Sequence, residues 1–504
     1  MSSTLPQIIA RAALHRDRLA IQDGRHAVSY RDLDDMSASV ALQLLEDKVD
    51  LADARVAFLV APGVAHIAIQ WGIWRAGGIA VPLPMSYPPA ELEYLIRDSG
   101  ASIVIADAPS EEKVRSIAQA VGARFFMSDG LVSGAEREPR RGPSVVAQGL
   151  SPARRAMIIY TSGTTSRPKG VVTTHSNITA QIESLVAAWE WTPADRTLLV
   201  LPLHHIHGII NVVCSALWSG AALEISSKFD PNETWNRLAS GELTVFTAVP
   251  TIYHRLIQAW EASTDDMRRA RSDGCRSLRL MMSGSAALPR AVLDRWAEIT
   301  GHVLLERYGM TEVGMALSNP VHGTRRPGFV GRPLPGVSVR LIEGELQLKG
   351  PGVFSEYWER PDMTRDAFDA GWFRTGDVAV LEEGDYRLLG RASVDIIKSG
   401  GAKLSALEIE EVLRTHPAID ECAVIGVEDS EWGQRVCCVV ELRPGAALGL
   451  NELRDWARTR LAPYKVPKDL RCVPQLPRNA VGKVIKPQLA TFFALPDPPE
   501  RRDS

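Results

Sequence analysis

One stretch of the sequence, YTSGTTSRPKG from Tyr160 to Gly170, gathers hydroxyl groups, glycines and a positive charge. The hydroxyl side chains that can donate hydrogen bonds are those of Thr161, Ser162, Thr164, Thr165 and Ser166. Lys169 adds a cation, and Gly163 permits backbone conformations that a side chain would hinder. Hydroxyl donors around a compact cation suit phosphate oxygens better than other common ligands. These residue types therefore predict a phosphate-binding loop.

Two apolar runs enclose this loop. AMII (156–159) leads into it and VVTT (171–174) leads out of it, which predicts two strands with the hydroxyl groups at the tip between them. A solvated surface turn is the common alternative for this composition, and the flanking strands argue against it. The loop is not of the Walker A type, because GxxxxGK(S/T) is not matched and no helical pattern follows at once.

Three histidines lie within LPLHHIHG (201–208). An HxH pair can bind a metal ion, but no carboxylate or further imidazole stands at a matching spacing. We therefore expect these histidines to line the core or a pocket, with His207 in contact with a ligand.

Two further stretches suit a nucleotide base and its phosphates. MMSGSAALP (281–289) ends an apolar run in small residues, which let a flat ring approach the backbone. In ERYGMTE (306–312), Tyr308 can stack on a purine, while Thr311 and Glu312 can face a phosphate and its metal ion. Glu312 alone is equally well explained as a carboxylate at the start of a helix.

The remaining stretches lie nearer the C-terminus. In GWFRTGDVAV (371–380), Asp377 can accept hydrogen bonds from ribose hydroxyls, although it could also be a turn residue. In PRNAVGKVIK (477–486), Lys483 follows a glycine in a predicted turn, or is one solvated lysine among many. Each motif has a purely structural explanation, but the whole set in this order along one chain argues against such explanations.

The elements that must position these motifs alternate through the first three quarters of the chain. Apolar runs at 55–62, 102–107 and 244–250 are each followed by a helical pattern, which predicts a layered α/β fold with largely parallel sheets. From about residue 337 the runs become short and hairpin-like, and we interpret them as a β-barrel-like subdomain. A smaller α+β unit follows Arg391. We therefore predict an N-terminal domain of residues 1–391 and a C-terminal domain of residues 392–504.

Length and composition limit the classes of function. A chain of 504 residues should divide into at least two domains, and a net charge of -3 gives no argument for nucleic acid or an anionic membrane as partner. No apolar run approaches the roughly 20 residues that span a bilayer. The first residues lack a secretory signal, and a cytosolic location is favoured, although composition leaves a mitochondrial presequence open. The oligomeric state is not indicated.

The motif set resembles that of the acyl-adenylate-forming superfamily, which includes acyl-CoA synthetases, luciferases and the adenylation domains of peptide synthetases. The similarity covers residues 10 to 490 or so. It implies an enzyme that uses ATP, Mg²⁺ and CoA, with a small mobile C-terminal domain. A departure is Ser166, which stands where the family usually has glycine and which we expect to stiffen or slow the loop.

The resemblance also implies roles for individual residues. Catalysis would involve Lys483, Thr311, Glu312 and Lys169, with Glu312 as the Mg²⁺ ligand. The adenine, ribose and phosphate contacts would come from Thr161, Ser162, Gly163, Thr164, Thr165, Gly284, Ser285, Ala286, Ala287, Glu306, Arg307, Tyr308, Gly309, Asp377 and Arg391. In this family the C-terminal domain turns about a hinge just after Arg391 and exchanges Lys483 for a second face. That face would admit CoA through Gly400 and Gly401, with Lys398 beside them and Arg325 near the CoA phosphates.

The acid substrate is the least determined feature. Amino-acid-activating members carry an aspartate near the position of the histidine stretch, and its absence here argues against an amino acid. The stretches LPLHHIHG, VPTIYHR, SGSAALP and RYGMTEVGMALSNP together resemble those of malonyl-CoA synthetases. By this resemblance Arg255, expected to be buried on an apolar helix, would clamp the distal carboxylate of malonate, assisted by His207, Ser285 and Met310. From the residues alone, an internal salt bridge between Arg255 and a protein carboxylate explains this arginine as well as a substrate clamp does.

Several alternatives stay open at this point. Methylmalonate fits the same clamp, and oxalate, a fatty acid or an aryl acid are other acid substrates. A stand-alone adenylation enzyme could load a carrier-protein thiol instead of CoA. A non-catalytic nucleotide-binding protein is a different class, and the joint presence of Lys483, Glu312 and Asp377 argues against it.

Overall fold

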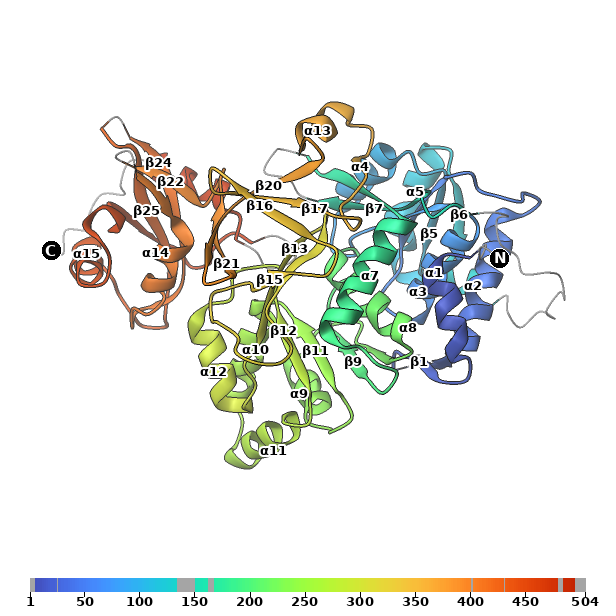
Figure 1. Ribbon diagram of the computed structural model, residues 1–504, viewed down its shortest axis with the longest axis horizontal. Helices are drawn as coiled ribbons and strands as arrows, with labels where there is room; N and C mark the ends of the chain where they lie inside the picture. The colour runs from blue at the N-terminus through green and yellow to red at the C-terminus, as the bar shows by residue number, and fades with distance from the viewer. Residues whose placement is uncertain are drawn as a thin grey trace.

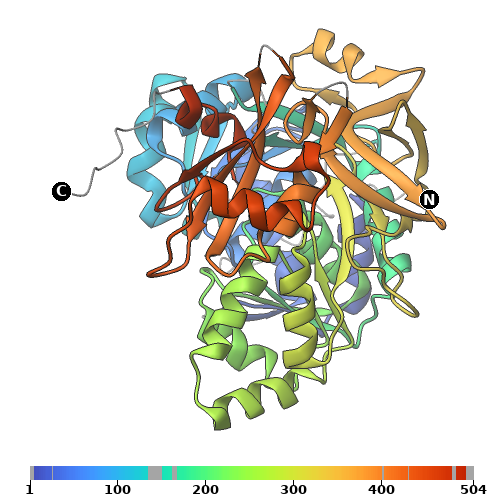
Figure 2. The ribbon, with the colours of Figure 1, turned by 90° about the vertical axis from the view of Figure 1, so that its left-hand side faces the viewer.

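The computed structural model describes residues 5–24, 26–133, 150–161, 167–399, 402–429, 431–478 and 484–494. Within these residues the strands form four sheets (Figure 1). Two large sheets and the third, antiparallel sheet build the N-terminal part. The fourth sheet and its helices lie at one end of the molecule, at the left of Figure 1 and in front in Figure 2.

The phosphate-loop stretch belongs to a seven-stranded sheet with the order β18-β8-β7-β4-β3-β5-β6. Its strands are β3 (Arg55–Leu59), β4 (Ile79–Pro82), β5 (Ile103–Ala106), β6 (Arg124–Met127), β7 (Arg155–Thr161), β8 (Lys169–Thr174) and β18 (Glu356–Tyr357). The helices between them are α3 (Val64–Arg75), α4 (Pro89–Ser99), α5 (Glu111–Ala120) and α6 (Ser128–Ser133). The pairs among β3, β4, β5 and β6 are parallel, so the alternation read from the sequence is confirmed.

The histidine stretch and the 281–289 stretch belong to a nine-stranded sheet with the order β15-β14-β13-β12-β11-β9-β10-β1-β2. Its strands are β1 (Leu19–Gln22), β2 (Ala27–Ser29), β9 (Arg196–Leu199), β10 (Ala222–Ile225), β11 (Val245–Ala248), β12 (Leu280–Ser283), β13 (Leu305–Met310), β14 (Gly314–Ser318) and β15 (Arg332–Pro333). The helices around it are α1 (Gln7–Ala12), α2 (Tyr30–Leu45), α7 (His175–Trp189), α8 (Ser215–Ser219), α9 (Pro231–Leu238), α10 (Pro250–Glu261), α11 (Asp265–Cys275) and α12 (Arg290–Thr300). A π-helical segment, η4 (His207–Cys214), follows the histidine stretch.

The main core lies between the two large sheets. Helix α3 is mostly apolar and buried on nearly every side, as expected of a helix packed between layers, and its Trp71 and Trp74 are fully buried. The same cluster of buried side chains includes Phe58 of the seven-stranded sheet and Leu199 of the nine-stranded sheet. This shared core fixes the two sheets relative to each other.

The hairpin-like stretch after residue 337 forms the third sheet. Its strands are β16 (Ser338–Ile342), β17 (Glu345–Lys349), β19 (Phe368–Asp369), β20 (Trp372–Glu382) and β21 (Asp385–Arg391), and α13 (Pro361–Asp366) precedes β19. Their pairs run in the open order β16-β17-β20-β19, with β21 beside β20. All of these pairs are antiparallel, as the hairpin pattern predicts.

The C-terminal unit is a separate α+β layer. Its strands are β22 (Ile396–Ser399), β23 (Ala402–Ser405), β24 (Ile419–Asp429), β25 (Gly433–Leu442) and β26 (Asp469–Cys472), and its helices are α14 (Ala406–Leu413), α15 (Leu450–Arg458), α16 (Lys486–Leu489) and α17 (Thr491–Ala494). The third sheet ends at Arg391 and the fourth begins at Ile396. The division at residue 391 remains our interpretation of where one domain ends. In the described part of the chain, no helix is long and apolar enough to cross a membrane.

Candidate active site

The predicted phosphate hairpin is present at the level of its two strands. Strands β7 and β8 pair antiparallel, and Thr161 stands opposite Lys169 at the open end. A Cβ on Gly170 would lie 2.7 Å from Ile158 Cγ2, so only glycine permits this close strand contact. The tip residues Ser162, Gly163, Thr164, Thr165 and Ser166 lie outside the described residues, so their phosphate contacts stay a prediction.

The base of this hairpin is held by Asp98 at the end of α4. Tyr160, directly before the loop, donates a hydrogen bond from its hydroxyl to Asp98 Oδ2 at 2.8 Å. Tyr94 donates from its hydroxyl to the carbonyl of Pro168, directly after the loop, at 2.9 Å. Arg360 pairs with Asp98 Oδ1 at 2.6 Å. One end of the loop is thus fixed to the partly buried Asp98 carboxylate and the other to Tyr94, whose hydroxyl lies 3.3 Å from Asp98 Oδ1.

Lys169 and Glu312 lie together behind the loop. The Lys169 Nζ lies 3.8 Å from Glu312 Oε1, which is an ion-pair distance, and 3.7 Å from the centre of the Tyr357 ring. Tyr357 donates from its hydroxyl to the same Glu312 oxygen at 2.9 Å. Burial lowers the pKa of Lys169, and the nearby Glu312 partly opposes this change. Thr311 precedes Glu312 in the half-buried turn between β13 and β14.

Tyr357 is a site residue that the sequence reasoning missed. It lies on the short strand β18, which pairs with β8 and so brings residue 357 beside the phosphate hairpin. The available signal was an aromatic pair, Tyr357 and Trp358, shortly before the helix that begins at Pro361. That signal is weak because aromatic pairs are common in ordinary cores.

The predicted nucleoside residues come from three separate strands and meet in one place. Tyr308 on β13 donates from its hydroxyl to Asp377 Oδ2 at 2.5 Å. Arg391, at the end of β21, donates from Nε to Asp377 Oδ1 at 3.0 Å. Burial, together with the charge of Asp377, raises the pKa of the Tyr308 hydroxyl well above its usual value, so the phenol stays a donor. Each Asp377 oxygen keeps a lone pair that a ribose hydroxyl can use.

A second polar cluster lies below the 284–287 stretch. Arg307 is fully buried on β13 and donates to Thr247 Oγ1 at 3.1 Å and to His207 Nε2. His207 Nδ1 lies 3.1 Å from Ser285 Oγ. The Nε2 of His207 must accept from Arg307, because a guanidinium has only donors; its proton therefore sits on Nδ1 and points to Ser285. Burial lowers the pKa of His207 well below its ordinary value, so the ring is neutral.

The backbone around this cluster explains its residue types. A Cβ on Gly284 would lie 2.4 Å from an Arg307 Nη1, so glycine leaves the space that the guanidinium fills. Ser285 is a non-glycine residue with φ at 71°, a left-handed conformation that exposes its side chain. Ala286 and Ala287 are exposed beside it.

Other predicted contact residues have mainly structural partners. Glu306 is buried and accepts a hydrogen bond from the Gly328 N–H at 2.8 Å, and burial raises the pKa of its carboxyl to about 8. A Cβ on Gly309 would lie 2.0 Å from the Gly314 carbonyl oxygen, so this glycine is required by the hairpin itself. Met310 is half-buried, with its sulfur 3.8 Å from the Tyr308 hydroxyl.

The burial predicted for Arg255 is wrong, while its predicted contact with the acid is not tested by the geometry. Arg255 was expected to be buried, but it is exposed on α10, where its guanidinium lies over the ring of Phe229 at 5.7 Å. The helix buries Ile252, Tyr253, Leu256 and Ile257 on one face, and Arg255 projects from the other.

The contact of Arg325 with the CoA phosphates stays a prediction. In the structure its guanidinium donates to the backbone carbonyls of Pro320, Val303 and Val321. These bonds fold the local loop and leave the side chain half-buried, and the burial lowers the pKa of Arg325.

The C-terminal candidates are only partly described. Lys398 is exposed on β22, opposite Lys403 on β23. Gly400, Gly401 and Lys483 lie outside the described residues, so their predicted roles stay predictions. Among the described residues, no group of three or more histidine, cysteine, aspartate or glutamate side chains could hold a metal ion.

The sheets, the pair of Lys169 with Glu312 and the pair of Tyr308 with Asp377 fit a nucleotide-binding enzyme of the adenylate-forming class. The chain matches the AMP-binding enzyme family over residues 9–358 and the AMP-binding enzyme C-terminal domain over residues 408–483. It therefore belongs to the AMP-binding enzyme family, and the resemblance read from the motifs is confirmed.

Two of the similar proteins are named malonate–CoA ligases. The human mitochondrial malonate–CoA ligase ACSF3 is 44% identical over 96% of this chain and 92% of its own length. The malonate–CoA ligase of Arabidopsis thaliana is 40% identical over 94% of this chain and 86% of its own length. The crystal structure of ATP-bound MatB from Rhodopseudomonas palustris superposes with a TM-score of 0.88 at 33% identity, covering 97% of this chain and 99% of that one.

Proposed function

We propose that this chain is an ATP-dependent acid–CoA ligase that converts malonate, ATP and CoA to malonyl-CoA, AMP and pyrophosphate. The named activity of the relatives supports this proposal, since two malonate–CoA ligases share 44% and 40% identity with nearly the whole chain. The observation in the structure that favours a dicarboxylate substrate is the buried guanidinium of Arg307.

Arg307 lacks a protein counter-charge among the described residues. Its partners are the neutral groups His207, Thr247 and the sulfur of Met315, and its Nε has no hydrogen-bond partner there. A buried cation without an anion is costly, and a carboxylate is the natural bidentate partner of a guanidinium. Malonate has two carboxylates, so one can neutralise Arg307 while the other reacts. We therefore assign the clamp to Arg307 in place of Arg255.

Ser285 and His207 complete the proposed clamp. The Nδ1 proton of His207 points to Ser285 Oγ, which frees the hydroxyl proton of Ser285 to donate to a carboxylate oxygen. Met310, half-buried on the same hairpin as Tyr308, is proposed to contact the short carbon chain between the carboxylates.

The reaction follows in two balanced steps. A carboxylate oxygen of malonate attacks the α-phosphorus of ATP, the bond to pyrophosphate breaks, and malonyl-adenylate forms. The thiol of CoA then loses its proton and attacks the acyl carbon, and AMP leaves. Lys169 and Lys483 are proposed to neutralise phosphate charge, and Thr311 and the loop hydroxyls to donate hydrogen bonds to the phosphates. Tyr308, Asp377 and Arg391 are proposed to hold the nucleoside. Lys398, Gly400 and Gly401 are proposed to border the pantetheine arm.

Glu312 fits a role as the protein ligand of Mg²⁺. It is a single buried carboxylate beside the phosphate hairpin, and Mg²⁺ in such sites takes one or two carboxylates together with substrate phosphates and waters. When bound, the ion would neutralise phosphate charge in the adenylation step. Glu312 is held in place for that role by the Tyr357 hydroxyl.

A cytosolic location remains our prediction, and the mitochondrial name of the human relative makes that organelle the alternative. Fractionation of cells that express the full chain with a C-terminal tag distinguishes the two locations.

The decisive experiment compares two arginines. Pyrophosphate release is measured with Mg-ATP, CoA and a panel of malonate, methylmalonate, oxalate, acetate, octanoate and amino acids. We expect malonate to lead. Arg307→Gln should raise the KM for malonate by roughly 10- to 100-fold, since a hydrogen bond to a charged group contributes about 1.5–3 kcal/mol. Acetate, which has no second carboxylate, should be used by the variant at least as well as by the wild type.

Arg255→Ala is the matched control and should behave as the wild type with every acid. Thermal melting of both variants confirms that they are folded. A monocarboxylate that leads the panel contradicts the malonate assignment. A selective loss of malonate in Arg255→Ala, with Arg307→Gln unaffected, places the clamp on α10 after all.

A further inference from the structure

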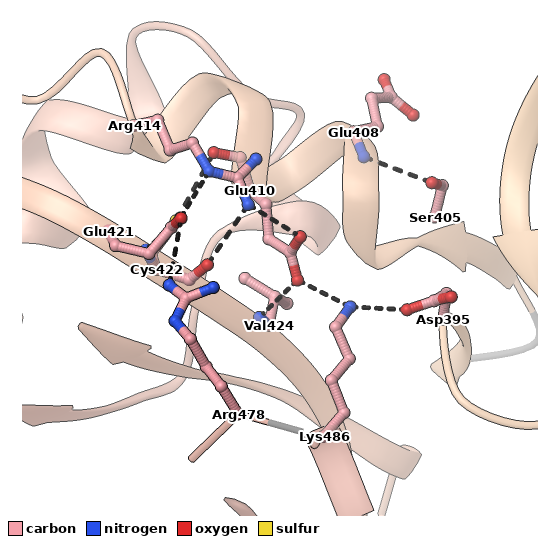
Figure 3. A network of polar contacts seen from close by, with 10 residues as sticks. All are labelled: Asp395, Ser405, Glu408, Glu410, Arg414, Glu421, Cys422, Val424, Arg478 and Lys486. Carbon is pink, nitrogen blue, oxygen red and sulfur yellow. Dashed lines mark hydrogen bonds and ion pairs between the residues drawn. The ribbon is translucent and has the colours of Figure 1, made fainter. Parts of the chain in front are cut away.

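Lys486, at the start of α16, is a buried lysine outside the nucleotide and acid sites (Figure 3). Its Nζ lies 2.6 Å from Asp395 Oδ1 and 2.6 Å from Glu410 Oε1. Burial by itself lowers the pKa of Lys486, but the two carboxylates outweigh that effect and raise it. The lysine therefore stays charged and bridges two carboxylates from different segments of the chain.

The Glu410 end of this bridge is rigid. Glu410 lies on α14 with its side chain 3% exposed. Its Oε1 accepts a hydrogen bond from the Val424 N–H at 2.8 Å, and Arg414 donates to its Oε2 at 3.3 Å. With backbone and side-chain partners on both oxygens, Glu410 fixes Lys486 to the body of the C-terminal unit.

The Asp395 end of the bridge contacts Arg391, a residue of the proposed ribose site. Asp395 Oδ2 accepts a hydrogen bond from the Arg391 N–H at 2.9 Å, and the Asp395 N–H donates to the Arg391 carbonyl at 2.7 Å. The Asp395 carbonyl accepts from the N–H of Ala406, the first residue of α14, at 2.8 Å. A Cβ on Gly390 would lie 2.4 Å from Asp395 Cβ, so glycine with its φ of 121° permits the tight turn.

A continuous set of contacts therefore joins Lys486 to the proposed ribose site. Asp395 shares its carboxylate between Lys486 and the backbone of Arg391, and the side chain of Arg391 pairs with Asp377. Removal of Lys486 would leave Asp395 with an unpaired charge in a poorly hydrated place. The turn that presents Arg391 would then lose its side-chain anchor to the C-terminal unit and keep only backbone-directed hydrogen bonds, such as that from the Ala406 N–H.

We propose that Lys486 is a positioning residue for nucleotide binding, which acts through Asp395 to hold the turn of residues 391–395 and, with it, Arg391 against Asp377. The residue touches neither substrate nor nucleotide in this arrangement. The inference rests on the proposed function for its kinetic consequences, but its effect on AMP binding follows from the AMP-binding family alone.

The first experiment compares Lys486→Met with Lys486→Arg in the full chain. We expect Lys486→Met to weaken AMP binding, measured by titration calorimetry, and to raise the KM for ATP by about 10- to 100-fold, as small misplacements of a binding group do. The KM for malonate should stay within about twofold, because the acid cluster around Arg307 lies outside these contacts. Lys486→Arg, which retains the charge and the donors, should restore AMP affinity.

The chain provides a matched control in a second lysine that pairs with a glutamate of α14. Lys465 Nζ pairs with Glu408 Oε1 at 2.6 Å, and Glu408 also lies on α14, but the Glu408 side chain is 44% exposed and, among the described residues, neither side chain of this pair bonds to Asp395. Lys465→Met should leave the AMP affinity and the KM for ATP unchanged.

A second variant separates positioning from charge balance. Lys486→Met with Glu410→Gln removes one charge of each sign, so the buried cluster keeps its net charge while the link to Asp395 is lost. Recovery of the melting temperature with AMP binding still weak supports the positioning role. Recovery of both overturns it, as does an AMP affinity of Lys486→Met equal to that of Lys465→Met.

The two proposals fail in different ways. Wild-type protein that binds AMP but releases no pyrophosphate with malonate overturns the proposed function, and the AMP titrations still test Lys486. Wild-type protein that is active with malonate, combined with unchanged AMP affinity and KM for ATP in Lys486→Met, overturns only the inference about Lys486.

Discussion

At the scale of single residues, the candidate site is marked by a half-buried lysine and a buried arginine with too few protein anions. Lys169 has Glu312 at 3.8 Å, longer than a hydrogen bond, and rests on the Tyr357 ring. Arg307 has only neutral partners among the described residues. Structural ion pairs elsewhere are closed, as in Arg279 with Asp195 at 2.7 Å. A ligand with several negative charges, such as ATP or a dicarboxylate, supplies what these two cations lack.

Tyr357 is expected to orient Glu312 for the metal ion. Tyr357→Phe keeps the ring under Lys169 and removes the hydrogen bond to Glu312 Oε1. The half-saturating Mg²⁺ concentration should rise roughly tenfold, for a lost interaction of about 1.5 kcal/mol, while the KM for malonate stays unchanged. Magnesium titrations of pyrophosphate release, and of ATP binding by calorimetry, measure the Mg²⁺ dependence. Pyrophosphate release with malonate varied measures the KM for malonate. Tyr386→Phe, in the same β-rich cluster, is the control, and an equal effect there refutes the role.

Glu306 should make stability depend on pH. Burial raises the pKa of its carboxyl from 4.5 to about 8, so the folded protein holds a proton there that the unfolded chain has lost above pH 4.5. The free energy of unfolding should therefore fall as pH rises from about 4.5 to 8, by at most about 1.4 kcal/mol per pH unit from this group. Glu306→Gln should flatten that dependence in urea unfolding. Glu298→Gln on the surface of α12 should leave it as in the wild type.

At the scale of elements, the site lies where strands from different sheets end side by side. Strands β11, β12 and β13 are adjacent and bring Thr247, Ser285 and Arg307 to one edge, while η4 adds His207. The phosphate hairpin β7–β8 belongs to the other large sheet, and the short strand β18 joins it to the β-rich subdomain. Carboxyl ends of parallel strands are the usual place for binding groups in open α/β sheets.

Asp98 is the expected anchor of that hairpin. Asp98→Asn keeps the shape of the side chain but removes the negative charge that pairs with Arg360. It also replaces one carboxylate oxygen with an NH2 group, so Arg360 and Tyr160 can no longer each donate to an oxygen of their own. We expect a higher KM for ATP with an unchanged KM for malonate, because only the ends of the phosphate loop are loosened. Steady-state kinetics with each substrate varied measure the split. Asp294→Asn on α12 serves as the control, and parallel rises in both KM values would point to general destabilisation instead.

At the scale of the whole molecule, separate cores serve the two units. Trp71, Trp74 and Trp189 belong to the core between the large sheets, whereas Ile409, Val424 and Cys438 belong to a core made by the C-terminal unit. The hydrogen bond from the Arg391 N–H to Asp395 connects the two units, and Lys486 bridges Asp395 to Glu410 within the C-terminal unit (Figure 3). Two cores with a narrow connection form a structure whose parts can unfold separately.

Scanning calorimetry of the full chain should therefore show two transitions. Adenosine monophosphate should shift the larger one most, since Tyr308, Asp377 and Arg391 belong to the N-terminal unit. At a concentration 100 times the dissociation constant, the added stability is about 2.7 kcal/mol. A single transition that AMP shifts as a whole would mean that the two units unfold as one.

Much of the local structure was predictable because it depends on neighbours in sequence. The apolar runs around the phosphate loop form the expected strands, and the alternating patterns form parallel strands with helices between them. Helical periodicity also indicates the exposure of Arg255. Since Ile252, Tyr253, Leu256 and Ile257 define the buried face of α10, a period of 3.6 residues already places Arg255 on the other face.

The sequence by itself determined the class of enzyme, because the nucleotide motifs are short, contiguous and ordered along the chain. Only the tertiary structure decided that Arg307 is buried among neutral partners, that Tyr357 bonds to Glu312, and that Lys486 reaches Asp395. Those contacts join residues separated by 45 to 100 positions, as from Tyr357 to Glu312 or from Arg307 to His207. Such pairs depend on strand order and on which charges are denied water, and both are set when distant segments pack together.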